Sequence, residues 1–340
     1  MESIPKVAII GCGLIGRKRS KALGGAALVY ACDVNIEAAR AVASNSRGCT
    51  AISDFRTALA DDDIDAVIVS TSNWMLAPIG IAAADAGKHV LLEKPGALTA
   101  KQLRDVQKAA VASRVAVKVG YNLRFHPGIM KAKSLVEAKA IGQVSIIRGR
   151  YGHGARKNYD REWRADPTLS GGGELLDQGV HLIDLSSWFL GDLVKVEGHC
   201  STYFWDMVVD DNAFVHVYTA TGSMAWLHVS CTEWKNTFSF ELQGSEGAIS
   251  VDGLGGSYGT ETVRLYKADS VDPGTDCIAW EYRGSDDSWE RDTRAFLSAM
   301  QEKSETEEPL GSEIKTLEIV ERIYELNHYP LSRSARSPSK

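Results

Sequence analysis

Two side chains with acid–base chemistry stand four positions apart near the middle of the chain. Asp177 and His181 belong to the segment G-G-G-E-L-L-D-Q-G-V-H-L-I-D, Gly171–Asp184. If the apolar periodicity after the glycines forms a helix, both side chains project from one face, about one turn apart. A histidine beside a carboxylate can take up and return a hydroxyl proton near neutral pH. The segment therefore predicts proton transfer. The competing interpretation is a glycine-capped helix whose histidine is solvated or satisfied in the core.

A glycine-rich turn near the amino end could hold phosphates. The sequence G-C-G-L-I-G contains Gly11, Gly13 and Gly16. It follows the apolar run Lys6–Ile10 and precedes Arg17–Leu23, which we expect to be helical. In this context the first glycine permits a tight turn, the second lets backbone amides approach a pyrophosphate, and the third lets helix and strand pack closely. The N–H groups that begin the helix complete a phosphate site, so the turn predicts dinucleotide binding.

Asp33 predicts which dinucleotide is bound. It follows the apolar strand Ala27–Ala31 and lies 22 positions after Gly11, where an acidic side chain accepts hydrogen bonds from the adenosine ribose hydroxyls. A carboxylate there repels the 2′-phosphate of NADP, and the nearest arginine on the following helix is Arg40. We therefore expect NAD as the cofactor in preference to NADP.

Lys94 is a candidate for contact with the substrate. It lies in Glu93-Lys94-Pro95, directly after the apolar strand His89–Leu92. The carboxyl end of a strand in a parallel sheet opens on the crevice that receives the dinucleotide. A lysine there can hold a substrate oxygen and stabilise or remove its proton. The alternative is a surface lysine in a turn before a proline.

The order of the elements predicts two domains. Up to about residue 120 short apolar strands alternate with helices, which indicates a doubly wound parallel sheet. After about residue 125, strands joined by short turns dominate, as in an antiparallel meander. The fold class is therefore α/β, with an N-terminal Rossmann domain (residues 1–124) and a C-terminal α+β domain (residues 125–330) that has a large, open, predominantly antiparallel sheet. Residues 331–340 are expected to form a flexible tail.

The second domain is expected to use its open sheet face as a subunit contact, in a homodimer or homotetramer. A helix is expected at Ile79–Ala86 in the first domain, and helices at Gly128–Ala138, Ser288–Glu302 and Ser312–Leu326 later in the chain. The strands expected in the second domain are Gln143–Tyr151, Val194–Phe204, Asp211–Thr219, Ser223–Cys231, Thr237–Gly244 and Gly247–Val251.

Composition argues against several classes of protein. The formal net charge is −6 over 340 residues, without a long basic block, so binding to nucleic acid or to a membrane surface is not expected. No apolar run approaches the ~18–20 residues of a membrane span, and the start M-E-S-I-P-K lacks the pattern of a signal peptide. We expect a cytoplasmic protein, in which the six cysteines are reduced, and their lack of C-x-x-C spacing suggests no metal site.

The segment Tyr151–Leu169 is interpreted as a polar loop that sets substrate specificity. Its aromatic side chains can pack on a sugar ring, and it carries four cations within nine positions. Because arginine forks onto carboxylate or phosphate, the loop suggests an anionic ligand such as a uronate, a sugar phosphate or a nucleotide sugar. A solvated basic face is the alternative. The cations are Arg156, Lys157, Arg161 and Arg164.

Taken together, the motifs resemble the glucose–fructose oxidoreductase / inositol dehydrogenase (Gfo/Idh/MocA) family of NAD(P)-dependent oxidoreductases. The matching segments are G-C-G-L-I-G, A-G-K-H-V-L-L-E-K-P, G-Y-N-L-R-F-H-P and G-G-G-E-L-L-D-Q-G-V-H-L-I-D, in family order over nearly the whole chain. The resemblance implies oligomers formed through the open sheet and redox chemistry at a secondary alcohol of a sugar, cyclitol or sugar derivative. One segment departs from the family: T-S-N-W-M-L at residues 71–76 replaces the common Thr-Pro-x-x-x-His, which leaves the detail of the cofactor contacts there open.

By position, the resemblance implies catalytic roles for Lys94, Asp177 and His181. We expect hydride transfer between the substrate carbinol carbon and nicotinamide, with His181 exchanging the hydroxyl proton, Lys94 favouring the alkoxide and Asp177 orienting one of the two. Whether Lys94 or His181 is the formal base is left open, because interacting groups titrate as a unit. The expected cofactor-binding residues are Gly11, Gly13, Leu14, Ile15, Gly16, Asp33, Ser70, Thr71, Asn73, Glu93, Lys94, Asn122, Trp163 and Arg164. The expected substrate-binding residues are Lys94, Arg124, Arg156, Tyr159, Trp163, Asp177 and His181.

Two other functions are compatible with these motifs. A nicotinamide-dependent glycosidase could use a similar transient oxidation, and a regulator could keep the dinucleotide fold without catalysis. The complete set of Lys94, Asp177 and His181 argues against an idle protein. A glycosidase would release no net NADH, which distinguishes it from a dehydrogenase.

Overall fold

The computed structural model describes residues 4–268, 276–301 and 309–329. The chain divides into two compact units, which we name the N-unit (Met1–Asn122 with Trp289–Lys315) and the C-unit (Leu123–Ser288 with Thr316–Lys340). The predicted tail 331–340 and Glu302, the end of a predicted helix, lie outside the described residues. The assignment of binding roles to residues 1–124 and 125–330 stays a prediction.

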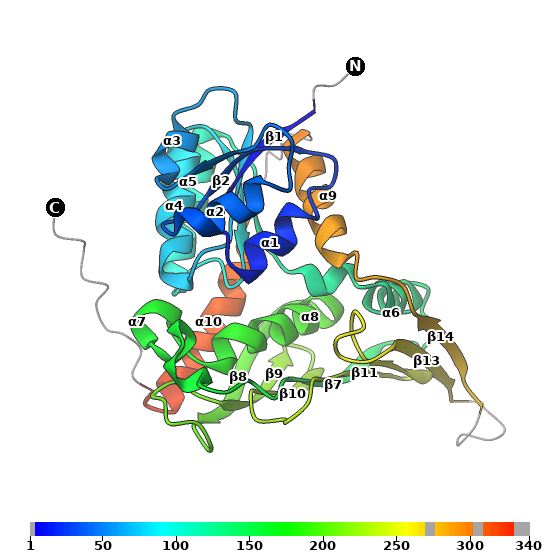
Figure 1. Ribbon diagram of the computed structural model, residues 1–340. Coiled ribbons are helices and arrows are strands. Elements are labelled where there is room, and N and C mark those ends of the chain that lie inside the picture. The colour runs from blue at the N-terminus through cyan, green and yellow to red at the C-terminus, as the bar shows by residue number, and fades with distance from the viewer. Residues whose placement is uncertain (1–3, 269–275, 302–308, 330–340) are drawn as a thin grey trace. The chain divides into compact units, whose positions relative to one another are not determined.

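Within the described residues, the N-unit is built on a parallel sheet, to which β1 and β2 in Figure 1 belong. Its six strands have the order β3-β2-β1-β4-β5-β6. This is the strand order of a dinucleotide-binding Rossmann sheet, and it confirms the doubly wound fold expected from the sequence. The strands are β1 (Lys6–Ile10), β2 (Ala27–Cys32), β3 (Thr50–Ile52), β4 (Ala66–Val69), β5 (His89–Glu93) and β6 (Val117–Gly120).

Helices cover both faces of this sheet: α1 (Leu14–Ser20), α2 (Ile36–Ala43), α3 (Phe55–Leu59), α4 (Asn73–Asp85), α5 (Ala100–Ser113) and α9 (Ser288–Gln301). Leu91 of β5 packs in a core shared with α2 and with Phe296 of α9. The next residue, Leu92, would contact a side chain added at Gly80 of α4. Because adjacent strand residues point to opposite faces, α2 and α9 cover one face and α4 covers the other.

Helix α4 begins at Asn73 rather than at the predicted Ile79, and Pro78 lies inside it. A proline within a helix removes one hydrogen bond and costs about 3 kcal/mol or more, which is why the sequence favoured a start after Pro78. Leu76 and Ala77 are both buried, and their packing stabilises the first turns of the helix against this cost.

In the C-unit, eight described strands form a second sheet in the order β14-β13-β12-β11-β7-β10-β9-β8. The neighbours β7 and β10 run parallel, and the other pairs are antiparallel, which confirms the predominantly antiparallel sheet. The strands are β7 (Val144–Gly152), β8 (Leu193–Ser201), β9 (Asn212–Thr219), β10 (Met224–Ser230), β11 (Thr237–Gly244), β12 (Gly247–Asp252), β13 (Glu261–Lys267) and β14 (Ile278–Tyr282).

Strands β13 and β14 were not expected from the sequence. The buried Val263 and Leu265 alternate with the more exposed Arg264 and Tyr266, so a period of two is present in β13. The glycine-rich run at residues 253–259 just before it favours a loop. The segment forms strand β13 because it pairs with β12, and the sequence pattern does not show this tertiary contact.

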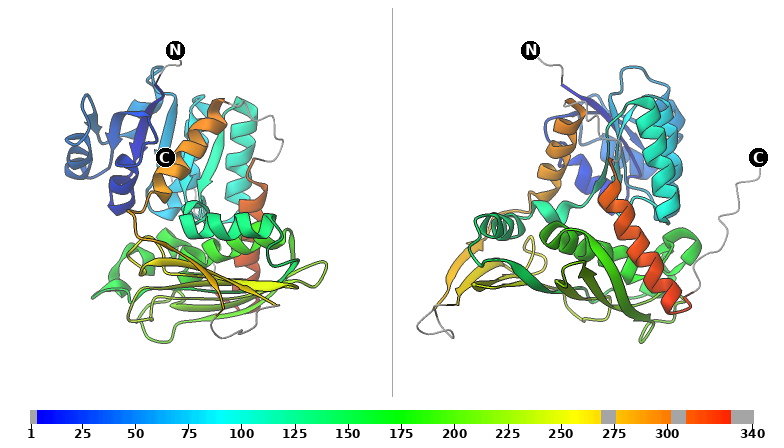
Figure 2. Two further views of the ribbon diagram at one scale, coloured as in Figure 1. Left: turned by 90° about the vertical axis from the view of Figure 1, so that its right-hand side faces the viewer. Right: turned by 180° about the vertical axis from the view of Figure 1, so that it is seen from behind.

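One face of this second sheet is covered by helices and the other is open (Figure 2). Helix α6 (Pro127–Glu137) packs against β12, β13 and β14, and α8 (Val180–Leu190) packs against β7 and β10. The short α7 (Pro167–Ser170) and α10 (Gly311–Leu326) complete the described helices. None of the helices in the described ranges is long and apolar enough to cross a membrane.

Candidate active site

The glycine turn of the N-unit has two positions where any side chain would collide with backbone. Gly11 has φ +97°, and a Cβ there would lie 2.6 Å from the Ser70 carbonyl. A Cβ on Gly16 would lie 1.9 Å from the carbonyl oxygen of Gly11. These two glycines therefore allow α1 to pack directly against the ends of β1 and β4, as the motif predicts.

Gly13 differs from both, because nothing lies within 4 Å of a Cβ built on it. It has φ −68°, which any residue can adopt, and it immediately precedes α1. Its carbonyl accepts the Arg17 N–H at 3.0 Å. The open space over Gly13, at the start of a helix, fits the predicted approach of a pyrophosphate to backbone amides.

Asp33 braces this turn from the end of β2. One carboxylate oxygen accepts the Cys12 N–H at 2.7 Å, and the other accepts the Asn35 N–H at 2.8 Å. Each oxygen keeps a further lone pair for a ribose hydroxyl. Burial, followed by the Asp33 charge, raises the pKa of the Cys12 thiol to about 12, so this cysteine stays a neutral packing residue.

At the end of β4, the predicted cofactor residues make local contacts. The Ser70 hydroxyl donates to the Gly11 carbonyl at 2.7 Å, and the Thr71 hydroxyl donates to the Ser72 carbonyl at 3.2 Å. Asn73 is buried at the first position of α4. Ser70 thus holds the glycine turn in place.

Lys94 follows β5 in a tight turn. The Glu93 carbonyl accepts the Gly96 N–H at 2.9 Å, which closes the turn around Lys94 and Pro95. The Glu93 side chain is buried and accepts the Arg19 Nε–H at 2.6 Å, a partner that the sequence analysis did not identify. Lys94 itself is half-buried. The predicted cofactor contact of Glu93 therefore concerns a carboxylate that an arginine already holds.

In the C-unit, Asp177 lies in a π-helical turn, Leu175–Gly179, and His181 lies in the first turn of α8. His181 is 3% exposed, and its ring forms a T-shaped pair with the Tyr151 ring at a centroid distance of 6.0 Å. Asp177 accepts the Arg164 Nε–H at 3.3 Å. π-Helical turns inside helices are frequent at functional sites, and this one carries the predicted acid–base aspartate.

Asp210 fixes the start of this helical segment. Its two carboxylate oxygens accept the N–H groups of Gly173 (3.0 Å) and Leu175 (2.8 Å), and it also accepts the Tyr324 hydroxyl of α10 at 2.8 Å. A Cβ on Gly173 would lie 1.9 Å from the Asp210 carbonyl oxygen, which explains the glycine there. Burial raises the pKa of Asp210 to about 6, although the three donors act in the opposite sense.

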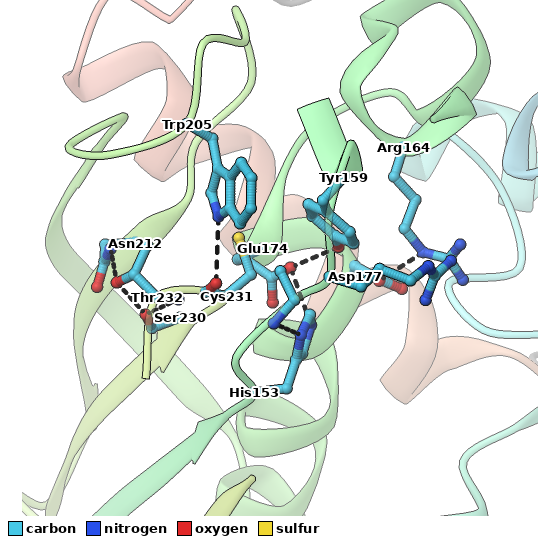
Figure 3. A network of polar contacts seen from close by, with 12 residues as sticks. His153, Tyr159, Arg164, Glu174, Asp177, Trp205, Asn212, Ser230, Cys231 and Thr232 are labelled. Atoms are coloured by element: carbon cyan, nitrogen blue, oxygen red, sulfur yellow. Dashed lines mark hydrogen bonds and ion pairs between the residues drawn. The ribbon is translucent and has the colours of Figure 1, made fainter. Parts of the chain in front are cut away.

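Glu174 is the centre of a buried polar network in the C-unit (Figure 3). It is 2% exposed and accepts the Tyr159 hydroxyl at 3.0 Å. The Nε2 atom of His153 lies 3.3 Å from the same oxygen, while Nδ1 accepts the Ala155 N–H at 3.0 Å. These contacts place a hydrogen of His153 on Nε2, toward Glu174. The sequence analysis named Tyr159 for substrate binding but gave Glu174 no role, although it stands three positions before Asp177.

The cations of the predicted specificity loop differ in their partners. Arg156 forks onto Glu162, with both N–O distances 2.6 Å, and Arg164 holds Asp177. The Arg164 guanidinium also lies over the Trp163 ring, 4.6 Å from its centroid. Lys157 and Arg161 are exposed.

Arg124 and Asn122 lie outside this network. The Arg124 guanidinium forks onto Asp184 of α8 with N–O distances of 2.8 and 2.5 Å, so its charge is used within the C-unit. Asn122 is buried in the N-unit. Within the described ranges, no group of three His, Cys, Asp or Glu side chains is arranged to hold a metal ion.

Comparison with known proteins matches both units. Residues 5–121 match the family described as oxidoreductases with an NAD-binding Rossmann fold, and residues 129–250 match the GFO/IDH/MocA C-terminal domain. The chain belongs to the Gfo/Idh/MocA family. Its oxidoreductase character and its NAD cofactor, both expected from the motifs, are thereby confirmed.

Individual relatives agree with this family. Over 281 residues the chain is 27% identical to levoglucosan dehydrogenase of Pseudarthrobacter phenanthrenivorans, covering 72% of each protein. It is 29% identical to inositol 2-dehydrogenase 4 of Saccharopolyspora erythraea, covering 66% of each. A solved structure of levoglucosan dehydrogenase with NADH and levoglucosan has the same fold, with a TM-score of 0.83 at 24% identity over 95% of this chain and 97% of that one.

Proposed function

We propose that this protein is an NAD-dependent dehydrogenase that interconverts a secondary alcohol and a ketone on a sugar or cyclitol. The observation that carries the proposal is the buried His181 in the first turn of α8, directly after the π-helical turn that presents Asp177. The family membership supplies the redox chemistry. Levoglucosan and inositol, the compounds for which two relatives are named, are both polyhydroxylated rings.

His181 exchanges the proton of the substrate hydroxyl in this proposal. Burial against Tyr151 keeps water away from its ring, and a group that titrates near neutral pH is efficient in both directions of the reaction. Bound NAD supplies the hydride acceptor at nicotinamide. Lys94, as an ammonium, donates a hydrogen bond to the same substrate oxygen and stabilises negative charge that develops there.

Asp177 keeps the charge of the site balanced. Its carboxylate accepts the Arg164 Nε–H, and in this proposal it orients His181 or Lys94 and offsets the positive charge formed on proton uptake.

The predicted preference for an anionic substrate depends on which cations of the loop are not already paired with carboxylates. Arg156 and Arg164 are already paired with Glu162 and Asp177, so the predicted preference for an anionic sugar rests on the exposed Lys157 and Arg161. Comparing KM for uronates and sugar phosphates with KM for neutral sugars, at low and high salt, tests it. A salt-sensitive preference for the charged compounds supports it, and equal KM values at both salt levels oppose it.

We propose further that two copies associate through the open face of the C-unit sheet and that the protein works in the cytoplasm. The open face carries Arg148 and Glu241, which pair with each other, and Trp226, which is 46% exposed. Aromatic and arginine side chains are enriched at protein–protein interfaces. All six cysteines have free thiols, which fits a reducing compartment.

The proposed reaction is tested with a panel of sugars and cyclitols, offering NAD and NADP in turn and following the absorbance of the reduced nicotinamide. Accumulation of NADH with at least one member of the panel, at a rate proportional to enzyme, is the expected result. Hydrolysis of a glycoside without net NADH would instead identify a glycosidase. Absence of both activities, in protein that binds NADH, would identify a regulator.

A further inference from the structure

A fully buried arginine in the N-unit lies beside the lysine turn. Arg19, in the last turn of α1, is 0% exposed. Its Nε–H donates to Glu93 at 2.6 Å, and its Nη2–H donates to Asp292 of α9 at 2.7 Å. The second oxygen of Asp292 pairs with Lys118 of β6. Two cations and two carboxylates therefore form one network that joins α1, β5, β6 and α9.

The remaining guanidinium nitrogen of Arg19, Nη1, also has hydrogen-bond acceptors. Nη1 lies 3.3 Å from the Thr293 hydroxyl and 3.4 Å from the Trp289 carbonyl, and the guanidinium lies 4.8 Å from the centroid of the Trp289 ring. At Gly120 a Cβ would lie 2.3 Å from Arg19 Nη2, so the end of β6 is shaped to admit the guanidinium. Each of the three guanidinium nitrogens therefore has an acceptor within hydrogen-bonding distance.

Stability alone does not explain this network. Removing charges from water is costly, and well-packed apolar residues often serve equally well in such places. Although burial opposes charge on Asp292, Lys118 and Arg19 lower the pKa of its carboxyl, so the network is ionic. Arginine can bind carboxylates on two different elements through its planar guanidinium, whereas lysine carries a single ammonium group.

The residue that this network holds is Glu93, the last residue of β5. Its backbone pairs with Gly120 of β6, its carbonyl closes the turn around Lys94, and its carboxylate is held by Arg19. Lys94 is its direct neighbour. Helix α1 thus begins at the proposed phosphate site and, from its last turn, fixes the strand end that carries the lysine.

We propose that Arg19 is a positioning residue for the reaction, which holds Lys94 in its working place through Glu93. The inference rests on the proposed catalytic role of Lys94. Displacing a catalytic group by about 1 Å can cost about 10²-fold in rate, so a small change in the Arg19–Glu93 contact should act mainly on kcat. Lysine in place of Arg19 keeps the charge and loses the fork.

The test compares Arg19→Lys with wild type and with Lys21→Gln, which removes an exposed charge at the end of the same helix. In Arg19→Lys we expect kcat per folded molecule to fall about 10²-fold, with little change in KM or in NADH affinity, and the pH profile of kcat to shift. Lys21→Gln should match wild type. A lower melting temperature with unchanged kcat and pH profile would show that Arg19 is only structural.

A second measurement does not depend on turnover. The rate at which acetic anhydride modifies Lys94, measured by peptide mass spectrometry across pH without substrate, reports the surroundings of its amine. We expect the profile to shift in Arg19→Lys and to stay unchanged in Lys21→Gln. If wild type oxidises no sugar, the proposed function fails, and this comparison still decides the positioning role.

Thr293→Val covers the case in which Arg19→Lys does not fold. It retains both ion pairs and removes one acceptor from the guanidinium. A several-fold lower kcat together with a shifted acetylation profile is expected. Wild-type values of both quantities in this variant would overturn the inference.

Discussion

At the scale of single residues, the two proposed proton-handling groups have different supports. His181 is held within a helix and packs against Tyr151, whereas Lys94 is held by a turn whose anchor is the neighbouring Glu93. In the proposed mechanism both groups act on the substrate, and neither is a residue of the glycine turn. Their substitutions should therefore separate catalysis from cofactor binding.

We expect Lys94→Ala and His181→Ala each to lower kcat by about 10²–10⁴-fold, the usual cost of a lost acid–base group, while NADH affinity changes far less. Stopped-flow or steady-state kinetics on the true substrate, with NADH titrations by fluorescence, measure both quantities. Lys101→Ala, on the exposed side of α5, is the matched control. Near wild-type turnover of either active-site variant would remove that residue from the mechanism.

Replacing Asp33 should affect both the coenzyme preference and the contacts that hold the glycine turn. Asp33 accepts the N–H groups of Cys12 and Asn35, and we expect its carboxylate also to repel the 2′-phosphate of NADP. We expect Asp33→Ser to narrow the ratio of kcat/KM for NAD over NADP by about one to two orders of magnitude, as relief of a like-charge contact allows. NADH affinity should fall as well, because the turn loses an acceptor.

The control for Asp33 is Asp54→Ser, which removes a carboxylate that accepts the Arg56 N–H at the start of α3 and has no proposed cofactor role. Its coenzyme preference should equal that of wild type. Equal use of NAD and NADP by the wild-type protein would show that Asp33 does not face the ribose, and Arg17 or Arg40 would then be candidates for the phosphate.

At the scale of elements, different glycines of the turn are expected to serve folding and cofactor binding. Gly13→Ala should fold with an unchanged melting temperature, because its Cβ meets nothing within 4 Å. The methyl group would stand where the pyrophosphate approaches, and losing one hydrogen bond to a charged group weakens NADH binding by roughly 10- to 150-fold. Calorimetric NADH titration and a thermal melt measure the two effects.

Gly16→Ala is the counterpart, because its Cβ would overlap the Gly11 carbonyl oxygen. We expect it to lose stability by about 1–3 kcal/mol or more through overpacking of α1 on β1, and to bind NADH poorly as a consequence. If Gly13→Ala proved the less stable of the two, the assignment of packing to Gly16 and access to Gly13 would be wrong.

The π-helical turn depends on Asp210 and Tyr324, and its stability should depend on pH. Tyr324→Phe removes a donor to Asp210 and should cost about 1–3 kcal/mol at pH 8. Because the pKa of Asp210 is raised to about 6, its carboxyl is neutral below that pH, and the loss should shrink toward pH 5. Urea unfolding at both pH values measures this.

Tyr329→Phe is the control, since its hydroxyl donates to the Val208 carbonyl in an exposed contact. Its cost should be smaller, because the acceptor in that bond is a neutral carbonyl rather than a carboxylate. A Tyr324→Phe effect of equal size at both pH values would mean that Asp210 does not titrate in this range.

At the scale of the whole molecule, the sequence predicted what local patterns encode. Alternating strands and helices, the glycine turn and the Asp177–His181 spacing led to the α/β fold, the NAD cofactor and the family, all of which are confirmed. The missed partners are distant in sequence: Arg19 and Asp292 are separated by 273 positions, and Asp210 and Tyr324 by 114. Such pairs have no local pattern, because they form only when the elements pack.

The open face of the C-unit sheet leads to a prediction about assembly. We expect a dimer in solution by light scattering, and Trp226→Lys to weaken it at least about 30-fold, the effect of losing an aromatic hot spot of about 2 kcal/mol. Trp226 pairs with Arg148 on β7 and with His216 on β9. A lysine at position 226 would therefore stand between two other basic side chains. Val111→Lys, on an exposed position of α5, should leave the dimer intact. A wild-type monomer at micromolar concentration, or a dimer indifferent to Trp226→Lys, would assign this face to another role.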